Sequence, residues 1–456
     1  MADVVASGGQ GAGPSVPISR RSCPALDDDE LGRRPGVVLA AVYADEAAER
    51  RGPGWVPTSE RFRDPSSRLI MRCESTRPTT AAITFLSRPS GADRHNGAMT
   101  PADDSDLTAL RDQCTRFLGG HGPMRAAEML ATIPPDCVVD RYGEGGVVKE
   151  LESEIAGLLG KEAALFLPSG TMAQQAVLRV HADRRGRRTV VFHPMCHLER
   201  HEGQAYRRLQ QLVGRAAGDP NRLLTAEDLA GIAEPVAALL LELPQRDIGG
   251  QQPSWDDLVA QCGWARQAGA AVHLDGARLW ESAAGYGRSP AEIAALFDTV
   301  YVSFYKGIGA LAGCCVAGPA EIMAEVREWR ERMGGMLIAL WPNAASALTC
   351  LADRLPRMGT YMRHATAIAA ALRDVHGVTV IPDPPQTPMM HLLLGTTADR
   401  FAAAARALAA EQRIWAWPHA MTTADPSVQR VELSVGDATC ALEPEEVATA
   451  VAALVA

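Results

Sequence analysis

The sequence predicts an α/β protein in which a large domain with a mainly parallel sheet precedes a small C-terminal α+β domain. Across residues 162–304, short apolar runs typical of strands alternate with amphipathic segments typical of helices, as in a parallel sheet with helical crossovers. The run at 234–244 is apolar enough for a central strand covered on both faces. After Trp341, a long helical pattern leads into shorter, mixed elements. We therefore expect a large domain over residues 104–340 and a linker helix with the small domain over 341–456.

Each expected element has its own start or stop signal. The first helix closes at Gly160, because glycine is a common helix terminator, and Ser289 is a good N-cap for a later helix. The expected helices of the large domain cover 150–160, 171–184, 255–269 and 289–298. The expected strands there cover 162–170, 189–194, 234–244, 270–278 and 299–304. In the C-terminal part we expect helices over 344–375, 399–412 and 443–455, and strands over 389–395, 413–418 and 429–436.

Composition excludes several classes of protein. The 456 residues carry a formal net charge of -9, which argues against a nucleic-acid carrier or a basic membrane-surface protein. No apolar run reaches the roughly 18 residues that a membrane helix needs, and the N-terminus lacks the pattern of a secretory signal. The ten cysteines show no paired CxxC spacing, so we expect free thiols, no metal site and a cytoplasmic protein.

Residues 1–100 differ from the rest of the chain. They are rich in Arg, Pro, Ser, Gly and Asp and contain no lysine. Such a segment buries too little apolar surface to offset the entropy of ordering. We expect a disordered extension, or an over-long reading frame whose translation starts at Met99. The alternative is a small regulatory domain.

A strand that runs into Ser-Gly-Thr and then a helix forms the first chemical motif, in LFLPSGTMAQQ. The first N–H groups of a helix lack partners and carry the positive end of its dipole. Gly170 lets the backbone approach an anion, and Thr171 adds a hydroxyl, so this segment suits a phosphate group. The alternative is simple helix capping.

Two further motifs place ionisable groups after apolar strands. Asp275 ends the strand in AAVHLDGAR, where ligands gather in open α/β sheets; the alternative is an ion pair with Arg278. Lys306, one of only three lysines, lies among glycines and apolar residues in VSFYKGIGALAG. Apolar surroundings lower the pKa of a lysine amine and make it nucleophilic, as a Schiff base requires. A buried structural lysine is the alternative.

Spacing brings these three motifs together. Asp275 and Lys306 end consecutive strands separated by one helix, and a right-handed crossover places both strand ends at one edge of the sheet. An anion site, a carboxylate and a nucleophilic lysine at one edge are what pyridoxal 5'-phosphate (PLP) requires. The sequence therefore predicts PLP as cofactor.

The motifs also resemble those of a known family. YGEGG, LFLPSGTMAQQ, HLERHEG, ELPQRDIGG, HLDGARLW and SFYKGIGALAG occur in this order over about residues 105–456. In this they resemble the threonine aldolases, β-eliminating lyases of the fold-type I PLP enzymes. The resemblance implies an aminotransferase-like fold with a seven-stranded sheet, and a homodimer or homotetramer.

The resemblance also implies roles for matching residues. Lys306 matches the lysine that binds the cofactor aldehyde, and Asp275 matches the acid that keeps the pyridine nitrogen protonated. His197 matches the histidine that stacks on the ring and handles the proton of the substrate hydroxyl. The residues matching other cofactor-binding positions are Gly170, Thr171 and Arg278. Glu202 and the turn Tyr142-Gly143-Glu144 also fit the pattern.

Two positions depart from the family pattern. Leu337 stands where threonine aldolases have an arginine that helps bind the substrate carboxylate. In the loop ELPQRDIGG, Arg246 is displaced by one position. Arg246 is then the expected carboxylate partner, because its guanidinium can bind a carboxylate with two hydrogen bonds.

We therefore predict retro-aldol cleavage of a β-hydroxy-α-amino acid, a threonine-like small molecule, to glycine and an aldehyde. One alternative is β-elimination, racemisation or transamination with the same cofactor. Another is a non-catalytic relative, against which the presence of both Lys306 and Asp275 argues. Neither nucleic acid nor a membrane is an expected partner.

Overall fold

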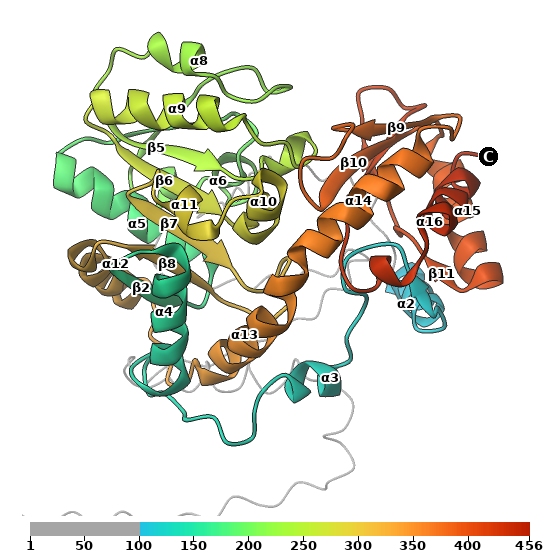
Figure 1. Cartoon of the computed structure of the whole chain (residues 1–456), viewed down its shortest axis with the longest axis horizontal. Helices are drawn as coiled ribbons and strands as arrows, with labels where there is room; N and C mark the ends of the chain where they lie inside the picture. The colour runs from blue at the N-terminus through green and yellow to red at the C-terminus, as the bar shows by residue number, and fades with distance from the viewer. Residues whose placement is uncertain (1–100) are drawn as a thin grey trace, which may run out of the picture. The chain divides into compact units, whose positions relative to one another are not determined.

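The computed structural model describes residues 101–456 (Figure 1). Its largest element is a seven-stranded sheet with the order β2-β8-β7-β6-β5-β3-β4. The strands are β2 (Ala163–Leu167), β3 (Thr189–Phe192), β4 (Val213–Ala216), β5 (Val236–Glu242), β6 (Ala271–Gly276), β7 (Thr299–Ser303) and β8 (Cys314–Gly318). Strands β4, β3, β5, β6 and β7 run parallel, whereas β8 is antiparallel to both β7 and β2. The predicted mainly parallel sheet is thus confirmed.

Helices cover both faces of this sheet. Alternate residues of a strand point to opposite faces, and the buried apolar residues divide accordingly into two clusters. One face packs against α5 (Gly170–Arg185) and α12 (Ala320–Arg332). The other face packs against α4 (Gly146–Leu159), α9 (Trp255–Gln267), α10 (Leu279–Tyr286), α11 (Pro290–Ala294) and α13 (Trp341–Arg354).

The C-terminal part has its own sheet. Its four strands have the order β12-β13-β10-β9, with β9 (Val378–Ile381), β10 (Met389–Leu394), β12 (Met421–Thr422) and β13 (Gln429–Ser434). Helices α14 (Met358–Leu372), α15 (Ala398–Gln412) and α16 (Pro444–Ala453) complete this part. The expected mixture of helices and strands is therefore present in the C-terminal part.

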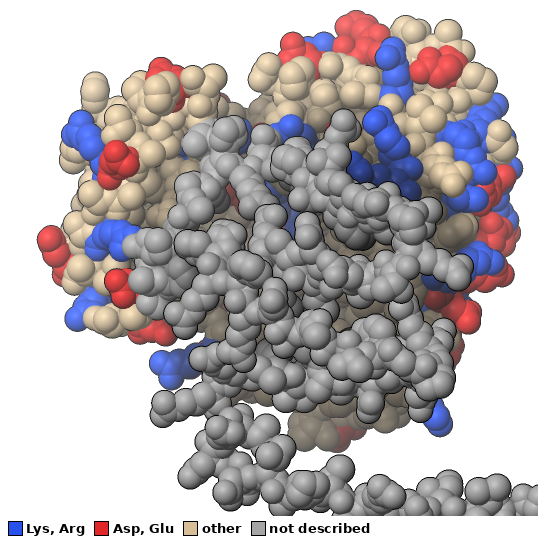
Figure 2. Space-filling view, turned by 180° about the vertical axis from the view of Figure 1, so that it is seen from behind, with Lys and Arg blue, Asp and Glu red and all other residues tan. Residues whose placement is uncertain are grey.

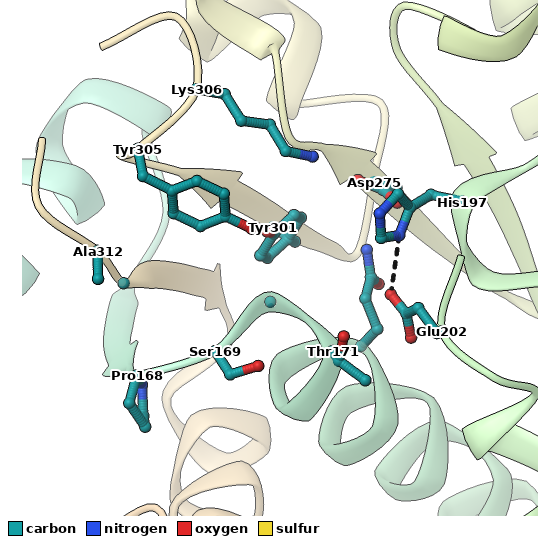
Figure 3. A pocket seen from close by; sticks show the side chains of 13 residues that line it. Pro168, Ser169, Thr171, His197, Glu202, Asp275, Tyr301, Tyr305, Lys306 and Ala312 are labelled. Atoms are coloured by element: carbon teal, nitrogen blue, oxygen red, sulfur yellow. Dashed lines mark hydrogen bonds and ion pairs between the residues drawn. The ribbon is translucent and has the colours of Figure 1, made fainter. Parts of the chain in front are cut away.

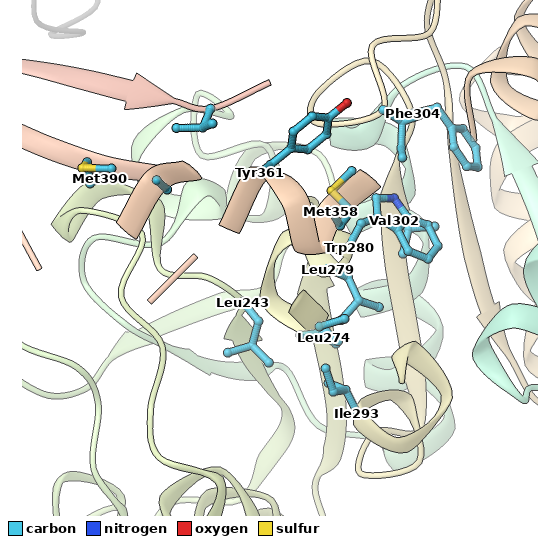
Figure 4. Close-up of a cluster of buried hydrophobic side chains, with 14 of the residues drawn as sticks. Leu243, Leu274, Leu279, Trp280, Ile293, Val302, Phe304, Met358, Tyr361 and Met390 are labelled. Carbon is cyan, nitrogen blue, oxygen red and sulfur yellow. The ribbon is translucent and has the colours of Figure 1, made fainter. Parts of the chain in front are cut away.

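The apolar cluster on the face covered by α4, α9 and α10 extends from the seven-stranded sheet to the four-stranded sheet. Leu274 and Val302 lie on the large sheet, Trp280 on α10, Met358 on α14 and Met390 on β10, and all five belong to one buried cluster (Figure 4). Each such side chain stabilises the fold by about 1.5–3 kcal/mol through removal from water. The small sheet is therefore held against the large one by shared core.

Most expected elements lie within a few residues of their predicted bounds, and the differences have local causes. The long helix expected over 344–375 is interrupted after α13 by a 3-10 turn at Leu355–Arg357, because Pro356 cannot continue an α-helix. The strand expected over 413–418 is only Ile414–Trp415 (β11), and it pairs in parallel with β1 (Arg116–Phe117) rather than with the small sheet.

Several elements escaped the sequence analysis. Strand β4 is an exposed edge without the apolar pattern of a buried strand, and β8 follows a glycine-rich segment. The unpredicted helices include α2 (Pro101–Arg111), α3 (Ala126–Ala131), α6 (His197–Arg200), α7 (Ala205–Arg208) and α8 (Ala226–Ala230). Expectations for residues 1–100 concern a segment outside the described residues.

Charge is mixed on the surface of the described residues. Figure 2 shows both basic and acidic side chains around the visible face, and many arginines pair with carboxylates, as Arg184 does with Glu321 and Glu325. Within residues 101–456, no helix is both long and apolar enough to cross a membrane. The eight described cysteines are free thiols.

Candidate active site

A cavity of about 220 Å³ lies beside the carboxyl ends of β6 and β7 and the start of α5 (Figure 3). It brings together five of the seven predicted site residues, from four separate motifs: Gly170, Thr171, His197, Asp275 and Lys306. The alternation of side chains along a strand explains part of this arrangement. Every second residue of β6, namely Ala271, His273 and Asp275, points to the face that α5 covers. Register places Asp275 opposite Glu242 on β5 and Tyr301 on β7.

Lys306 follows β7 and extends its side chain toward Asp275 (Figure 3). Burial lowers the pKa of the Lys306 amine below its ordinary value, while the negative charge of Asp275 opposes this shift. A lowered pKa leaves more of the amine unprotonated and available to attack a carbonyl.

Asp275 is 1% exposed, and its Oδ1 accepts a hydrogen bond from the Ala277 backbone N–H at 3.2 Å. The alternative structural ion pair with Arg278 is not formed. Arg278 instead pairs with Glu432, at 3.1 Å, and lies 3.7 Å from Glu281. Among the described residues Asp275 has no ion-pair partner within 4.0 Å, so its carboxylate faces the cavity without one.

The start of α5 lacks the side-chain capping hydrogen bond that the alternative interpretation of this motif requires. Ser169 occupies the N-cap position, yet its side chain forms no capping hydrogen bond. Ser169, Gly170 and Thr171 all line the cavity. The helix therefore presents free N–H groups and hydroxyls to an anion in the cavity.

His197 lies at the start of α6 and forms a chain of contacts with two polar residues. Its Nδ1 lies 3.2 Å from Glu202 Oε1, and Glu202 Oε2 accepts a hydrogen bond from Gln175 Nε2 at 2.9 Å. Burial alone would lower the pKa of His197, but the hydrogen bond to Glu202 and the Asp275 charge raise it above its ordinary value. Burial in turn raises the pKa of Glu202, and His197 opposes that rise.

Glu242 ends β5 behind this histidine. Its two oxygens accept hydrogen bonds from the His197 N–H at 2.9 Å and the Arg246 N–H at 3.1 Å. Burial and the neighbouring Asp275 charge raise the pKa of Glu242. Glu242 therefore fixes the backbone that carries His197, a role the sequence did not reveal because the two residues are 45 positions apart.

Arg246 does not line this cavity. Its Nε lies 2.7 Å from Glu432 Oε2, and its Nη1 lies 3.3 Å from Asp247. Glu432, on β13, thereby joins Arg246 to Arg278. Arg278 lines a second, smaller cavity of about 50 Å³ that also contacts Lys306 and the buried carboxylate of Glu281.

Other residues singled out by the family pattern lie outside both cavities. Leu337 is 46% exposed. Tyr142 donates its backbone N–H to Ile338 O at 3.1 Å, and Glu144 pairs with Arg327. Gly143 packs against the buried guanidinium of Arg330, where an added Cβ would lie 3.0 Å from a nitrogen.

The cavity contains three polar residues that the sequence analysis missed. They are Gln174, Tyr301 and Tyr305. Tyr301 could have been found from strand parity, since it lies directly opposite Asp275 in register. Gln174 lies one turn into α5, and no pattern in the sequence distinguishes it.

A match to a family model decides the relationship. The model described as "Beta-eliminating lyase" matches residues 119–394, more than half of the chain. The chain belongs to the β-eliminating lyase family. It is therefore a lyase of a PLP-dependent family.

Individual similar proteins and solved structures support the same family and fold. Low-specificity L-threonine aldolase 1 of Arabidopsis thaliana is 27% identical over 267 residues, covering 56% of this chain and 73% of the plant protein. A solved candidate L-allo-threonine aldolase of Listeria monocytogenes is 38% identical with a TM-score of 0.72, covering 77% of this chain and 98% of that one. A serine palmitoyltransferase of S. paucimobilis is 17% identical with a TM-score of 0.54, covering 74% and 86%, and it shares the fold alone. The fold is that of the fold-type I PLP enzymes.

The residues of this lyase fit the family's cofactor. Gly170 has no room for a side chain, since an added Cβ would lie 2.2 Å from the Tyr301 hydroxyl. Glycine therefore lets this hydroxyl lie beside the first turn of α5, where the N–H groups can bind a phosphate. The buried Asp275 has no cationic partner among the described residues and suits a protonated pyridine nitrogen. Lys306 supplies an amine of lowered pKa.

Proposed function

We propose that this enzyme binds PLP and cleaves a β-hydroxy-α-amino acid of the threonine class to glycine and an aldehyde. The observation that carries the proposal is one cavity that joins a helix N-terminus, the buried Asp275 and the amine of Lys306. The names of the relatives, L-threonine aldolases of both low-specificity and L-allo type, favour this reaction within the family.

Named residues would hold the cofactor. Lys306 would provide the amine for its aldehyde, Asp275 would pair with the pyridine nitrogen, and His197 would contact the ring. Gly170 and Thr171 would bind the phosphate, and Arg278, which lines the second cavity with Lys306, would be a further cofactor-binding residue. When bound, PLP supplies an electron sink for the electron pair left on Cα when a bond to Cα breaks.

His197 and Glu202 are the residues that we propose for proton transfer. In the retro-aldol reaction the β-hydroxyl loses its proton, the Cα–Cβ bond breaks, the aldehyde leaves and Cα gains a proton. His197 has a ring nitrogen beside the cavity, and Glu202 holds its Nδ1 at 3.2 Å. We assign His197 as the base for the hydroxyl proton and Glu202 as the residue that orients and polarises its ring.

The substrate carboxylate needs a cationic partner, since leaving it unpaired in a closed site costs several kcal/mol. Arg246 remains the proposed partner, and Arg278 is the second candidate because it lines the cavity next to Lys306. Glu432 pairs with both arginines. We propose that the substrate carboxylate takes over one of these two contacts.

Assembly and organisation complete the proposal. We propose a large cofactor-binding domain over residues 104–340, a linker helix and small domain over 341–456, and a dispensable extension over 1–100. We further propose a cytoplasmic homodimer or homotetramer, with sites at the subunit boundary. Mass measurement of the purified protein in solution tests the assembly.

The deciding experiment has two steps. The purified protein should be yellow, and borohydride should bleach the colour and fix the cofactor to Lys306; peptide mapping is simple because the chain has only three lysines. Glycine and aldehyde release from threonine then identifies the aldolase. Release of ammonia or a keto acid instead would indicate β-elimination or transamination. A colourless, inactive protein would indicate a non-catalytic relative.

A further inference from the structure

The cavity wall near the start of α5 is poor in positive charge. Among the described residues that line the cavity, Lys306 is the single Lys or Arg. The proposed function commits that amine to the cofactor aldehyde. The N-terminus of α5 contributes only about half a positive charge, so a doubly charged phosphate needs further donors.

Tyr301 places a hydroxyl beside this helix start. The side chain is 3% exposed, and its ring comes from β7 on the face that α5 covers. Its hydroxyl lies so close to the backbone of Gly170 that an added Cβ would come within 2.2 Å of it. A phosphate at the first turn of α5 would therefore meet this hydroxyl.

Tyr305, two residues after the end of β7, adds a second hydroxyl. It lines the same cavity as Tyr301. Burial, with the negative charges nearby, raises the pKa of both phenols above their ordinary value. Both therefore remain protonated at neutral pH and can donate hydrogen bonds to an anion.

An independent observation also points to a ligand in this cavity. Gln174 is 1% exposed and lines the cavity, and its Nε2 is buried without a hydrogen-bond partner among the described residues. Its Oε1 is already bound to His273 Nε2 at 2.8 Å, and His273 is held in turn by Thr299. Burial lowers the pKa of His273 to about 3, so the ring is neutral. The amide of Gln174 is thus held in place with its N–H groups available as donors.

We propose that Tyr301 and Tyr305 donate their hydroxyls to the cofactor phosphate, so that the phosphate is held by neutral donors. Ser169, Thr171 and the first N–H groups of α5 supply the remaining hydrogen bonds. This inference rests on the proposed function, because PLP is the phosphate-bearing ligand. It assigns to two tyrosines the anion-binding role that a cationic side chain would otherwise have.

The test compares PLP with pyridoxal, which has the same ring and aldehyde but lacks the phosphate. Apoprotein of full length is titrated with each compound, and the absorption of the bound form gives the dissociation constant. Loss of one hydrogen bond to a charged group should weaken PLP binding about 10- to 100-fold in Tyr301→Phe and in Tyr305→Phe. Pyridoxal affinity should not change.

Tyr286→Phe is the matched control, since Tyr286 donates to Pro253 O at 2.7 Å and lies outside the cavity. It should bind both compounds as the wild type does. Thermal melting of each apoprotein checks folding. If Tyr301→Phe unfolds the chain because Tyr301 is buried, Tyr305→Phe still tests the proposal, since Tyr305 is half-exposed.

Four outcomes would overturn the inference. Unchanged PLP affinity in both variants would mean that the tyrosines do not touch the phosphate. An equal loss for PLP and pyridoxal would place them on the ring. Wild-type protein that binds pyridoxal as tightly as PLP would show that no phosphate site exists, although the proposed PLP chemistry could stand; failure to bind either compound would remove the proposed function as well.

Discussion

Replacing Arg246 with alanine tests how the enzyme recognises an amino acid. Arg246 Nε lies 2.7 Å from Glu432, whose other oxygen lies 3.1 Å from Arg278. A substrate carboxylate bound by Arg246 must replace Glu432 or share the guanidinium with it. The backbone of Arg246 is held separately, through its N–H to Glu242 at 3.1 Å, so truncation of the side chain should leave the loop in place.

The expected effect follows from the lost charge-assisted hydrogen bonds. Removing a bidentate partner of a carboxylate should reduce kcat/KM by roughly 2–4 kcal/mol, or about 30- to 700-fold. Cofactor binding should persist, because Arg246 is not among the residues lining the cavity around Lys306. Arg246→Lys should restore only part of the loss, since an ammonium cannot form the two parallel bonds.

Glycine release at varied substrate concentration measures the effect, with cofactor absorbance recorded on the same samples. Arg215→Ala is the control, because it removes an exposed arginine paired with Glu234. Unchanged kinetics in Arg246→Ala would refute the assignment. Arg278→Ala would then be the next variant, followed by Arg430, on β13, and Arg332, which is paired with Glu328.

The other predictions concern the cofactor, the base and the extension. Lys306→Ala should lose turnover and the borohydride-fixed cofactor, as mass spectrometry of the reduced protein would show. Asp275→Asn should remain folded but lose at least ~10²-fold in kcat, about 2.7 kcal/mol; near-wild-type rates would contradict its role. Glu202→Gln should lower the pKa of His197, because the hydrogen-bonded carboxylate raises it. If neutral His197 is the base, the acid side of the pH profile of kcat/KM should then move to lower pH, and an unmoved profile would count against the pair. A chain beginning at Met99 should fold, bind the cofactor and turn over like the full chain, as melting and kinetics would show.

The sequence was most informative where local pattern and chain topology agree. Asp275 and Lys306 were expected at one edge because a right-handed crossover joins their strands, and β6 and β7 are indeed parallel neighbours. The start of α5 was expected from its Ser-Gly-Thr signal, and the helix begins at Gly170.

The remaining site features depend on contacts between distant segments. The position of Tyr301 against Gly170 requires β2, β8 and β7 to be adjacent, and β8 had no strand pattern of its own. The partner of Arg246 lies on β13, 186 residues further along (432 − 246). No residue spacing within one segment could reveal either contact, because both are set by the tertiary order of strands.

The pairing of β1 with β11 has a consequence for the order in which the chain is made. Arg116 lies opposite Ile414, which is 298 residues later (414 − 116). At a ribosomal rate of roughly 5–20 residues per second, β1 leaves the ribosome about 15 to 60 s before its partner exists. During that interval the large sheet can already form, whereas this short strand has no native neighbour. The start of the described chain is therefore among the last segments to reach its final place during synthesis, although it is among the first to be translated.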